Sequence, residues 1–137
     1  MENQVTSIEQ SKRLIDLGVP AEKASMIYQS HFTQGVPKLY AQPYQRNGYP
    51  PKEKIREDVV PAFTVADLLG MIPAEITYGR LYVSHPKIPS VKNDFNVFYK
   101  RVGREKGAIK SFRHPNLTCA CVMMVEWLLS NGYELNL

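Results

Sequence analysis

A strongly apolar helical pattern near the C-terminus constrains the fold more than any other feature of this sequence. Apolar residues recur there at helical spacing: Leu117, Ala120, Cys121, Met124, Val125, Leu128 and Leu129. This spacing places all of them on one face of an α-helix, and such a face has to be buried. We therefore expect this helix to be the centre of the core, with Asn131 and Gly132 at its C-terminal cap.

Two further apolar residues, Met123 and Trp127, lie on the flank of the same expected helix. Apolar side chains therefore extend most of the way round it, and burial on two sides would explain the pattern. The second covering surface would be another part of the chain or a second subunit. We take Met123 and Trp127 as candidate interface residues and expect a homo-oligomer, because a three-stranded sheet cannot cover this much apolar surface.

The length and composition of the chain are those of a single folded domain. Its 137 residues, of which 44% are hydrophobic and 22% charged, can build one core, so we treat residues 1–137 as one domain. No apolar run approaches the ~20 residues that span a bilayer, and residues 1–8 do not resemble a secretory leader. We expect a soluble cytoplasmic protein with no membrane contact.

Helix signals also occur near the N-terminus and in the middle of the chain. Ser7 and Gln10 form a capping box that predicts a helix from about residue 7 to residue 17, followed by Gly18 as the C-terminal cap. After Pro20, apolar residues at helical spacing predict a second helix, and thus an N-terminal helical hairpin. A second capping box, Thr64 with Asp67, predicts a short helix that ends before residue 73.

Residues 31–61 show no regular pattern, because five prolines and three tyrosines are interspersed with polar residues. We expect this Pro/Tyr-rich segment to lie over the core, to contribute an edge strand or to bind something. After the middle helix, residues 76–85, 94–102 and 108–112 read as strands. The predicted fold is therefore α+β, with a small antiparallel sheet packed on the long C-terminal helix.

Three segments resemble known sequences: SIEQSKRLIDLGVPAEKASM near the start, VPAFTVADLLGMIP in the middle and MMVEWLLSNGYEL at the end. They resemble a group of short uncharacterised proteins of Bacteroidetes genomes, which are often found in prophages or other mobile elements. The shared motifs concern packing and capping. The resemblance implies a phage or mobile-element context and transfers no catalytic or binding residue.

Positive charge is concentrated between residues 92 and 113. Seven basic residues stand there against two acidic ones, so the local net charge is +5, compared with +4 for the whole chain. Aromatic residues alternate with these charges, a combination that can hold phosphates and stack bases. A half-exposed antiparallel sheet also places lysines outward and aromatics inward, without any nucleic acid. The candidate anion-binding residues are Lys92, Lys100, Arg101, Arg104, Lys106, Lys110 and Arg113.

No arrangement of residues in the sequence specifies a reaction. Cys119 and Cys121 lie in an apolar helix, where burial would suppress thiolate formation, and His31, His85 and His114 are scattered without zinc-ligand spacing. We therefore expect no cofactor and no metal, and rank an enzyme last. The first expectation is a non-enzymatic interaction or accessory protein, and the alternative is a nucleic-acid-binding accessory protein that uses the 92–113 strip.

Overall fold

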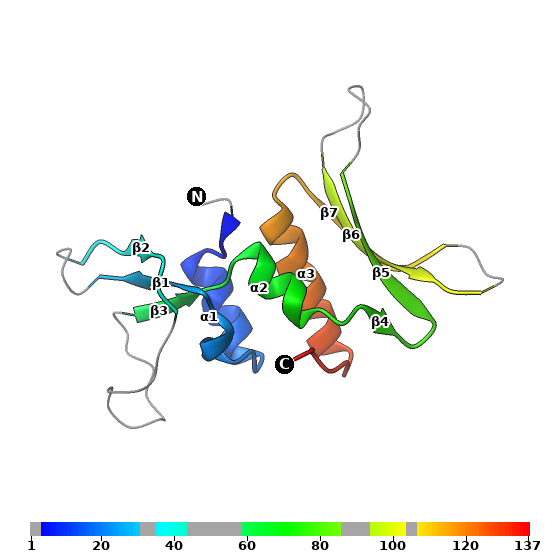
Figure 1. Ribbon diagram of the computed structural model, residues 1–137, viewed down its shortest axis with the longest axis horizontal. Coiled ribbons are helices and arrows are strands. Elements are labelled where there is room, and N and C mark those ends of the chain that lie inside the picture. Colours follow the sequence, from blue (N-terminus) through cyan, green and yellow to red (C-terminus); the bar gives the residue numbers. More distant parts are fainter. Residues whose placement is uncertain (1–3, 31–34, 44–58, 86–93, 104–106) are drawn as a thin grey trace.

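The computed structural model describes residues 4–30, 35–43, 59–85, 94–103 and 107–137. Helices occupy the centre of an elongated molecule, with a small antiparallel sheet at either end (Figure 1). The elements are α1 (Ile8–Asp16), η2 (Ala21–Lys23), β1 (Met26–Gln29), β2 (Lys38–Tyr40), β3 (Val59–Ala62), α2 (Val65–Met71), β4 (Glu75–Ile76), β5 (Gly79–Ser84), β6 (Phe95–Arg101), β7 (Ala108–His114) and α3 (Leu117–Ser130). The predicted α+β class is confirmed.

The two sheets differ in size and position. The smaller sheet has the strand order β2-β1-β3, and the larger one has the order β4-β5-β6-β7, with every neighbouring pair antiparallel. Two strands of the smaller sheet, β2 and β3, come from the Pro/Tyr-rich segment and form its edges, as one of the three expectations for that segment predicted. Residues 31–34 and 44–58 of that segment lie outside the described residues.

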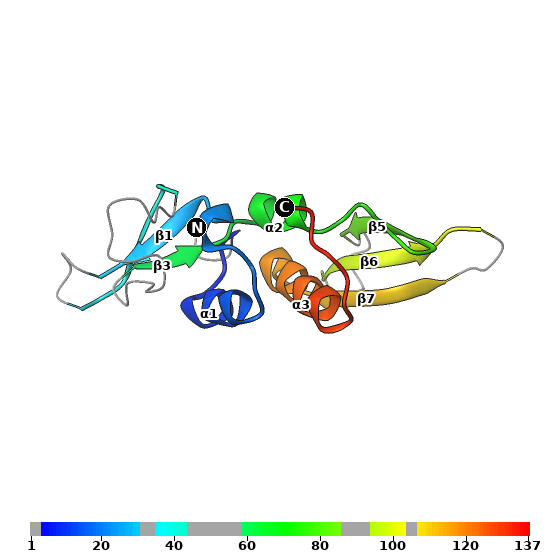
Figure 2. The ribbon, with the colours of Figure 1, turned by 90° about the horizontal axis from the view of Figure 1, so that it is seen from below.

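Helix α3 is the centre of the core, as its apolar pattern predicted. It packs against β6 and β7 on one side and against α1 and α2 on the others. Figure 2 shows α1 beside α3, on the side away from β6 and β7, with α2 lying above these two helices. The residues of α3 that are buried are Thr118, Ala120, Cys121, Val122, Met124, Val125 and Leu128.

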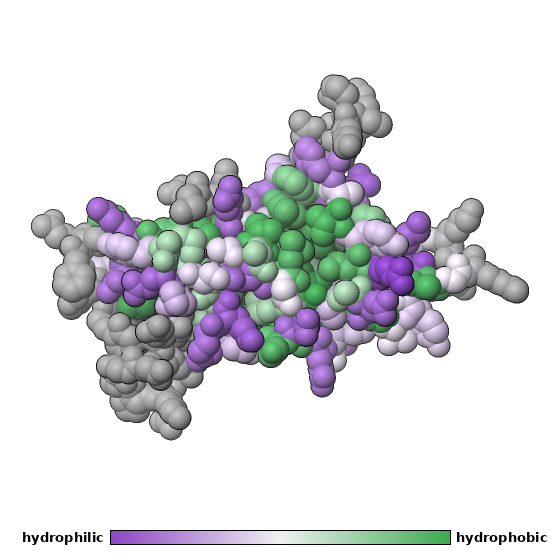
Figure 3. Space-filling model, in the orientation of Figure 1, coloured by the Kyte–Doolittle hydropathy of each residue, from purple (hydrophilic) through white to green (hydrophobic). Residues whose placement is uncertain are grey.

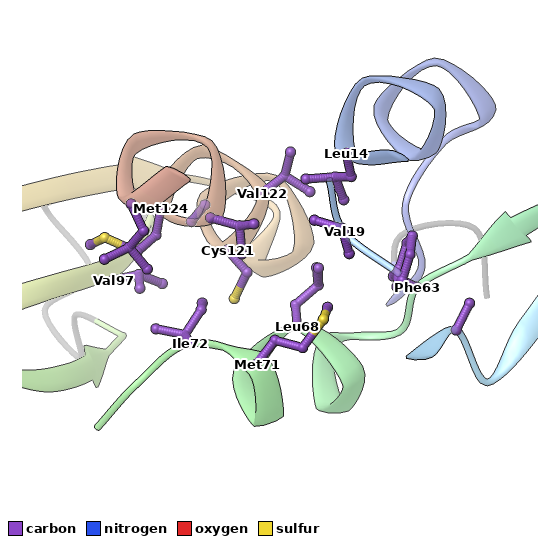
Figure 4. Close-up of a cluster of buried hydrophobic side chains, with 14 of the residues drawn as sticks. Leu14, Val19, Phe63, Leu68, Met71, Ile72, Val97, Cys121, Val122 and Met124 are labelled. Carbon is purple, nitrogen blue, oxygen red and sulfur yellow. The ribbon is translucent and has the colours of Figure 1, made fainter. Parts of the chain in front are cut away.

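The core joins side chains from the three α-helices and the segments that follow them. Leu14 of α1 and Val19 just after it lie around α3, together with Leu68 and Met71 of α2 and the following Ile72 (Figure 4). A surface view has apolar residues gathered over this central region and more hydrophilic ones toward the two ends (Figure 3). None of the helices in the described part of the chain is both long and apolar enough to cross a membrane.

Local hydrogen bonds account for the predicted helix starts. The side chains of Ser7 and Gln10 form the expected reciprocal capping box of α1, and those of Thr64 and Asp67 form that of α2. Each box satisfies backbone N–H groups that the first turn of a helix leaves without a partner. Gly132 follows α3 with a φ of 78°, the left-handed conformation that glycine adopts most easily.

The predicted N-terminal helical hairpin is wrong. Only one turn of 3₁₀-helix, Ala21–Lys23, follows α1, and the chain then enters β1 instead of a second helix. Ile27 pairs with Tyr40 on one neighbouring strand and with Pro61 on the other. The apolar spacing of this segment suits a helix, but Ile and Tyr also favour strands, and two distant strands complete the sheet.

The turn between β4 and β5 contains an unusual backbone conformation. Tyr78 has a φ of 61°, and no other described residue except glycine has a positive φ. Its side chain is 79% exposed, so few contacts offset the steric cost of this conformation. The turn is held in place because the carbonyl of Tyr78 accepts a hydrogen bond from the N–H of Val102 at 2.9 Å.

Replacing Tyr78 with glycine should therefore stabilise the protein. We expect Tyr78→Gly to raise the free energy of unfolding by about 0.5–1 kcal/mol, as measured by urea denaturation. Thr77→Gly is the matched control, since Thr77 is the neighbouring exposed turn residue without a positive φ. The control should lower stability, and equal effects of the two substitutions would contradict the strain at Tyr78.

Candidate nucleic-acid interface

The larger sheet has two faces of different chemistry. Val97 and Tyr99 of β6 are fully buried in the core beside α3. Successive residues of a strand point to opposite faces, and directly paired residues share a face. The register therefore assigns a common set of residues to the side away from α3, which we call the outer face: Glu75, Arg80, Tyr82, Ser84, Asn96, Phe98, Lys100, Ala108, Ser111 and Arg113.

The basic residues predicted from the sequence do not all belong to this face. Lys100 and Arg113 lie on the outer face, whereas Arg101 and Lys110 alternate to the other side. The ammonium group of Lys110 lies 5.2 Å from the centre of the ring of its inner-face neighbour Phe112. The remaining candidates, Lys92, Arg104 and Lys106, lie outside the described residues.

A pair of aromatic rings occupies the middle of the outer face. Tyr82 and Phe98 are direct cross-strand partners, and their rings stack with centroids 5.6 Å apart and an angle of 19° between planes. Tyr82 is 43% exposed. Tyr82 is not among the residues predicted from the sequence, although the alternation of residues 80–83 in one strand places Tyr82 on the face opposite Leu81.

Arg80 is a further basic residue that sequence analysis missed. It lies directly across from Lys100, next to the aromatic pair. Its guanidinium group forms an ion pair with Glu75 at 3.3 Å, but the two side chains are 56% and 68% exposed. An ion pair this exposed contributes little to stability, so the guanidinium group can exchange its partner for a phosphate. Among the described residues, the outer face thus carries three basic side chains and one acidic side chain, Glu75, which is the cross-strand partner of Arg80.

Polar groups that can bind bases lie beside the aromatic pair. The hydroxyl of Ser111 donates a hydrogen bond to Oδ1 of Asn96 at 2.6 Å. Ser111 lies directly opposite Phe98, and Arg113 lies directly opposite Asn96. The outer face therefore combines cations, aromatic rings and amide and hydroxyl groups within three neighbouring strands.

The two candidate interface residues of α3 differ in their surroundings. Trp127 is partly buried within its own chain, since its ring centroid lies 6.4 Å from that of Tyr99 and 5.4 Å from that of Tyr133. Met123 is 37% exposed. The second covering surface of α3 is thus supplied by α1 and α2 of the same chain. Self-association stays a prediction that depends on Met123.

The cysteine and histidine side chains considered as possible catalytic or metal-binding groups lie in surroundings that favour a structural role. Burial raises the pKa of the Cys121 thiol to about 12, so this thiol stays protonated at neutral pH and is a poor nucleophile. The Nδ1 atom of His114 accepts a hydrogen bond from the backbone N–H of Asn116 at 2.9 Å, just before α3 begins. Within the described ranges, no three His, Cys, Asp or Glu side chains lie close enough to hold a metal ion.

A shallow hollow of about 390 Å³ lies at the start of α3, and the residues that line it include Phe95, Pro115 and Leu117. Its lining has no charged side chain among the described residues, so it does not assemble an acid–base pair there.

Comparison with protein-family models, with curated proteins and with solved structures gave no match to this chain. Function is therefore inferred from the chemistry of the surface alone.

Proposed function

We propose that this protein is a non-enzymatic accessory protein that binds nucleic acid through the outer face of its larger sheet. The observation that carries the proposal is the position of the cations. Arg80 and Lys100 lie on one side of the Tyr82–Phe98 pair, and Arg113 lies on the other side, in the row of Asn96. Phosphates can thus be bound on both sides of an aromatic surface.

The spacing of these basic residues along the strands suits a polyanion that crosses the face. Residues two apart along a strand are separated by about 7 Å, so the cross-strand pair Arg80–Lys100 lies about 13 Å from the cross-strand pair Asn96–Arg113. Basic side chains at such spacing supply the sequence-independent part of nucleic-acid binding, through the release of counterions. A phage or mobile-element context, which the sequence resemblance implies, would give such an accessory protein a setting.

Binding should depend steeply on salt. Contacts from Arg80, Lys100 and Arg113 to three phosphates imply a slope of log affinity against log salt of about −2 for a single strand and about −3 for a duplex, or roughly a 20-fold to 40-fold loss between 50 and 200 mM. The double substitution Lys100→Glu and Arg113→Glu should lower affinity by at least about tenfold at low salt. Fluorescence anisotropy of a labelled oligonucleotide measures both effects.

The matched control is the double substitution Lys12→Glu and Lys38→Glu. It changes the net charge by the same amount, but Lys12 is exposed in α1 and Lys38 is exposed in β2 of the smaller sheet. The control should retain binding close to that of the unmodified protein. Equal losses in the two double variants would mean that net charge alone attracts the oligonucleotide, and absent or salt-independent binding would remove the proposal.

A further inference from the structure

We infer that the outer face binds single-stranded rather than double-stranded nucleic acid, with bases stacked on the rings of Tyr82 and Phe98. This inference rests on the proposed function and specifies the class of nucleic acid. Its basis is the aromatic pair together with the small residues and strand ends that surround it.

Both rings of the pair are accessible in part, since Tyr82 is 43% exposed and Phe98 is half-buried. The rings are nearly parallel, with 19° between their planes, so each ring turns one of its two sides toward the other. On the side of Phe98, the next strand contributes Ser111, which is small and exposed. On the side of Tyr82, β4 pairs with residues 79 and 80, and the N–H of Leu81 donates one further backbone hydrogen bond to the carbonyl of Ala74. A planar base can therefore be placed against either ring.

Only unpaired bases can use such a surface. In a duplex each base is stacked between its neighbours, so its face is closed to a protein side chain except at the ends. A single strand exposes these faces, and stacking on aromatic side chains is tolerant of sequence because every base has such a face. The cations on both sides of the pair hold the phosphates of the same strand.

Neighbouring polar groups complete the site for an unpaired base. The amide of Asn96 is oriented by its hydrogen bond with Ser111, and Asn96 lies two residues before Phe98 in β6, on the same face. A base stacked on Phe98 presents its edge to these two groups, and a ribose would present its 2′-hydroxyl to them. The site therefore accepts single-stranded RNA and single-stranded DNA by one shared chemistry.

The test compares fluorescein-labelled single strands of DNA and of RNA with the matching DNA duplex, at one low salt concentration. We expect the single strands to bind at least about tenfold more tightly than the duplex, and Tyr82→Leu and Phe98→Leu each to weaken single-strand binding by at least about fivefold. Tyr82→Phe, which keeps the ring, should bind like the unmodified protein. A higher affinity for RNA than for DNA would place the 2′-hydroxyl against Asn96 or Ser111, and equal affinity would leave stacking and charge as the contacts.

Tyr40→Leu is the matched control, because Tyr40 is a 37% exposed tyrosine on the smaller sheet. It should leave binding unchanged, and urea denaturation of every variant shows whether the fold is retained. The inference is overturned if the duplex binds as tightly as the single strands, or if folded Tyr82→Leu and Phe98→Leu variants bind single strands normally. Absence of salt-dependent binding to every oligonucleotide would instead remove the proposed function itself.

Discussion

Replacing Met124 with alanine is expected to lower the free energy of unfolding by about 2–5 kcal/mol. Met124 is fully buried in α3, within the cluster that joins all three helices to the larger sheet. Its truncation removes apolar contacts and leaves a cavity that the surrounding side chains fill only in part. Because domains of this size are stable by about 5–15 kcal/mol, urea denaturation should show a large shift of the midpoint.

The neighbouring methionine provides a control of the same chemistry. Met123 precedes Met124 in the same helix but is 37% exposed, so Met123→Ala should cost less than about 1 kcal/mol. A comparable cost at both positions would mean that Met123 is more deeply buried in solution than its exposure in the single chain indicates. It would also favour the homo-oligomer expected from the sequence, for which light scattering should then give a mass above 15.6 kDa.

Replacing Thr6 with valine is the second substitution with a large expected effect. The side chain of Thr6 is fully buried, and its Oγ1 atom accepts a hydrogen bond from the N–H of Phe63 at 3.0 Å. The same hydroxyl lies 2.6 Å from the buried hydroxyl of Ser11 in α1. Valine keeps the shape but leaves both partners unsatisfied, which should cost about 2–4 kcal/mol in urea denaturation.

Two further variants separate the hydrogen bonds from general effects of the substitution. Thr77→Val makes the same chemical change in an exposed turn and should alter stability by less than about 0.5 kcal/mol. Adding Ser11→Ala to Thr6→Val removes one of the unsatisfied groups and should recover part of the loss. A Thr6→Val protein as stable as the unmodified one would show that these hydrogen bonds contribute nothing net.

The candidate site could be predicted only in part from the sequence. The charge density of residues 92–113 is visible in the sequence, and two of its members, Lys100 and Arg113, lie together on the outer face. Arg80 and Tyr82 lie outside that window, and only the pairing of β5 with β6 brings them next to Lys100 and Phe98. Strand alternation also separates Lys110 from these residues, which a count of charges does not reveal.

The sequence by itself determined the three α-helices, because their signals are local. The capping boxes of α1 and α2 connect residues three apart, and the apolar face of α3 repeats within one continuous segment. Tertiary structure alone decided that residues 26–29 form a strand and which side chains share the outer face. Those features depend on hydrogen bonds between segments far apart in the chain, so no local pattern of residues contains them.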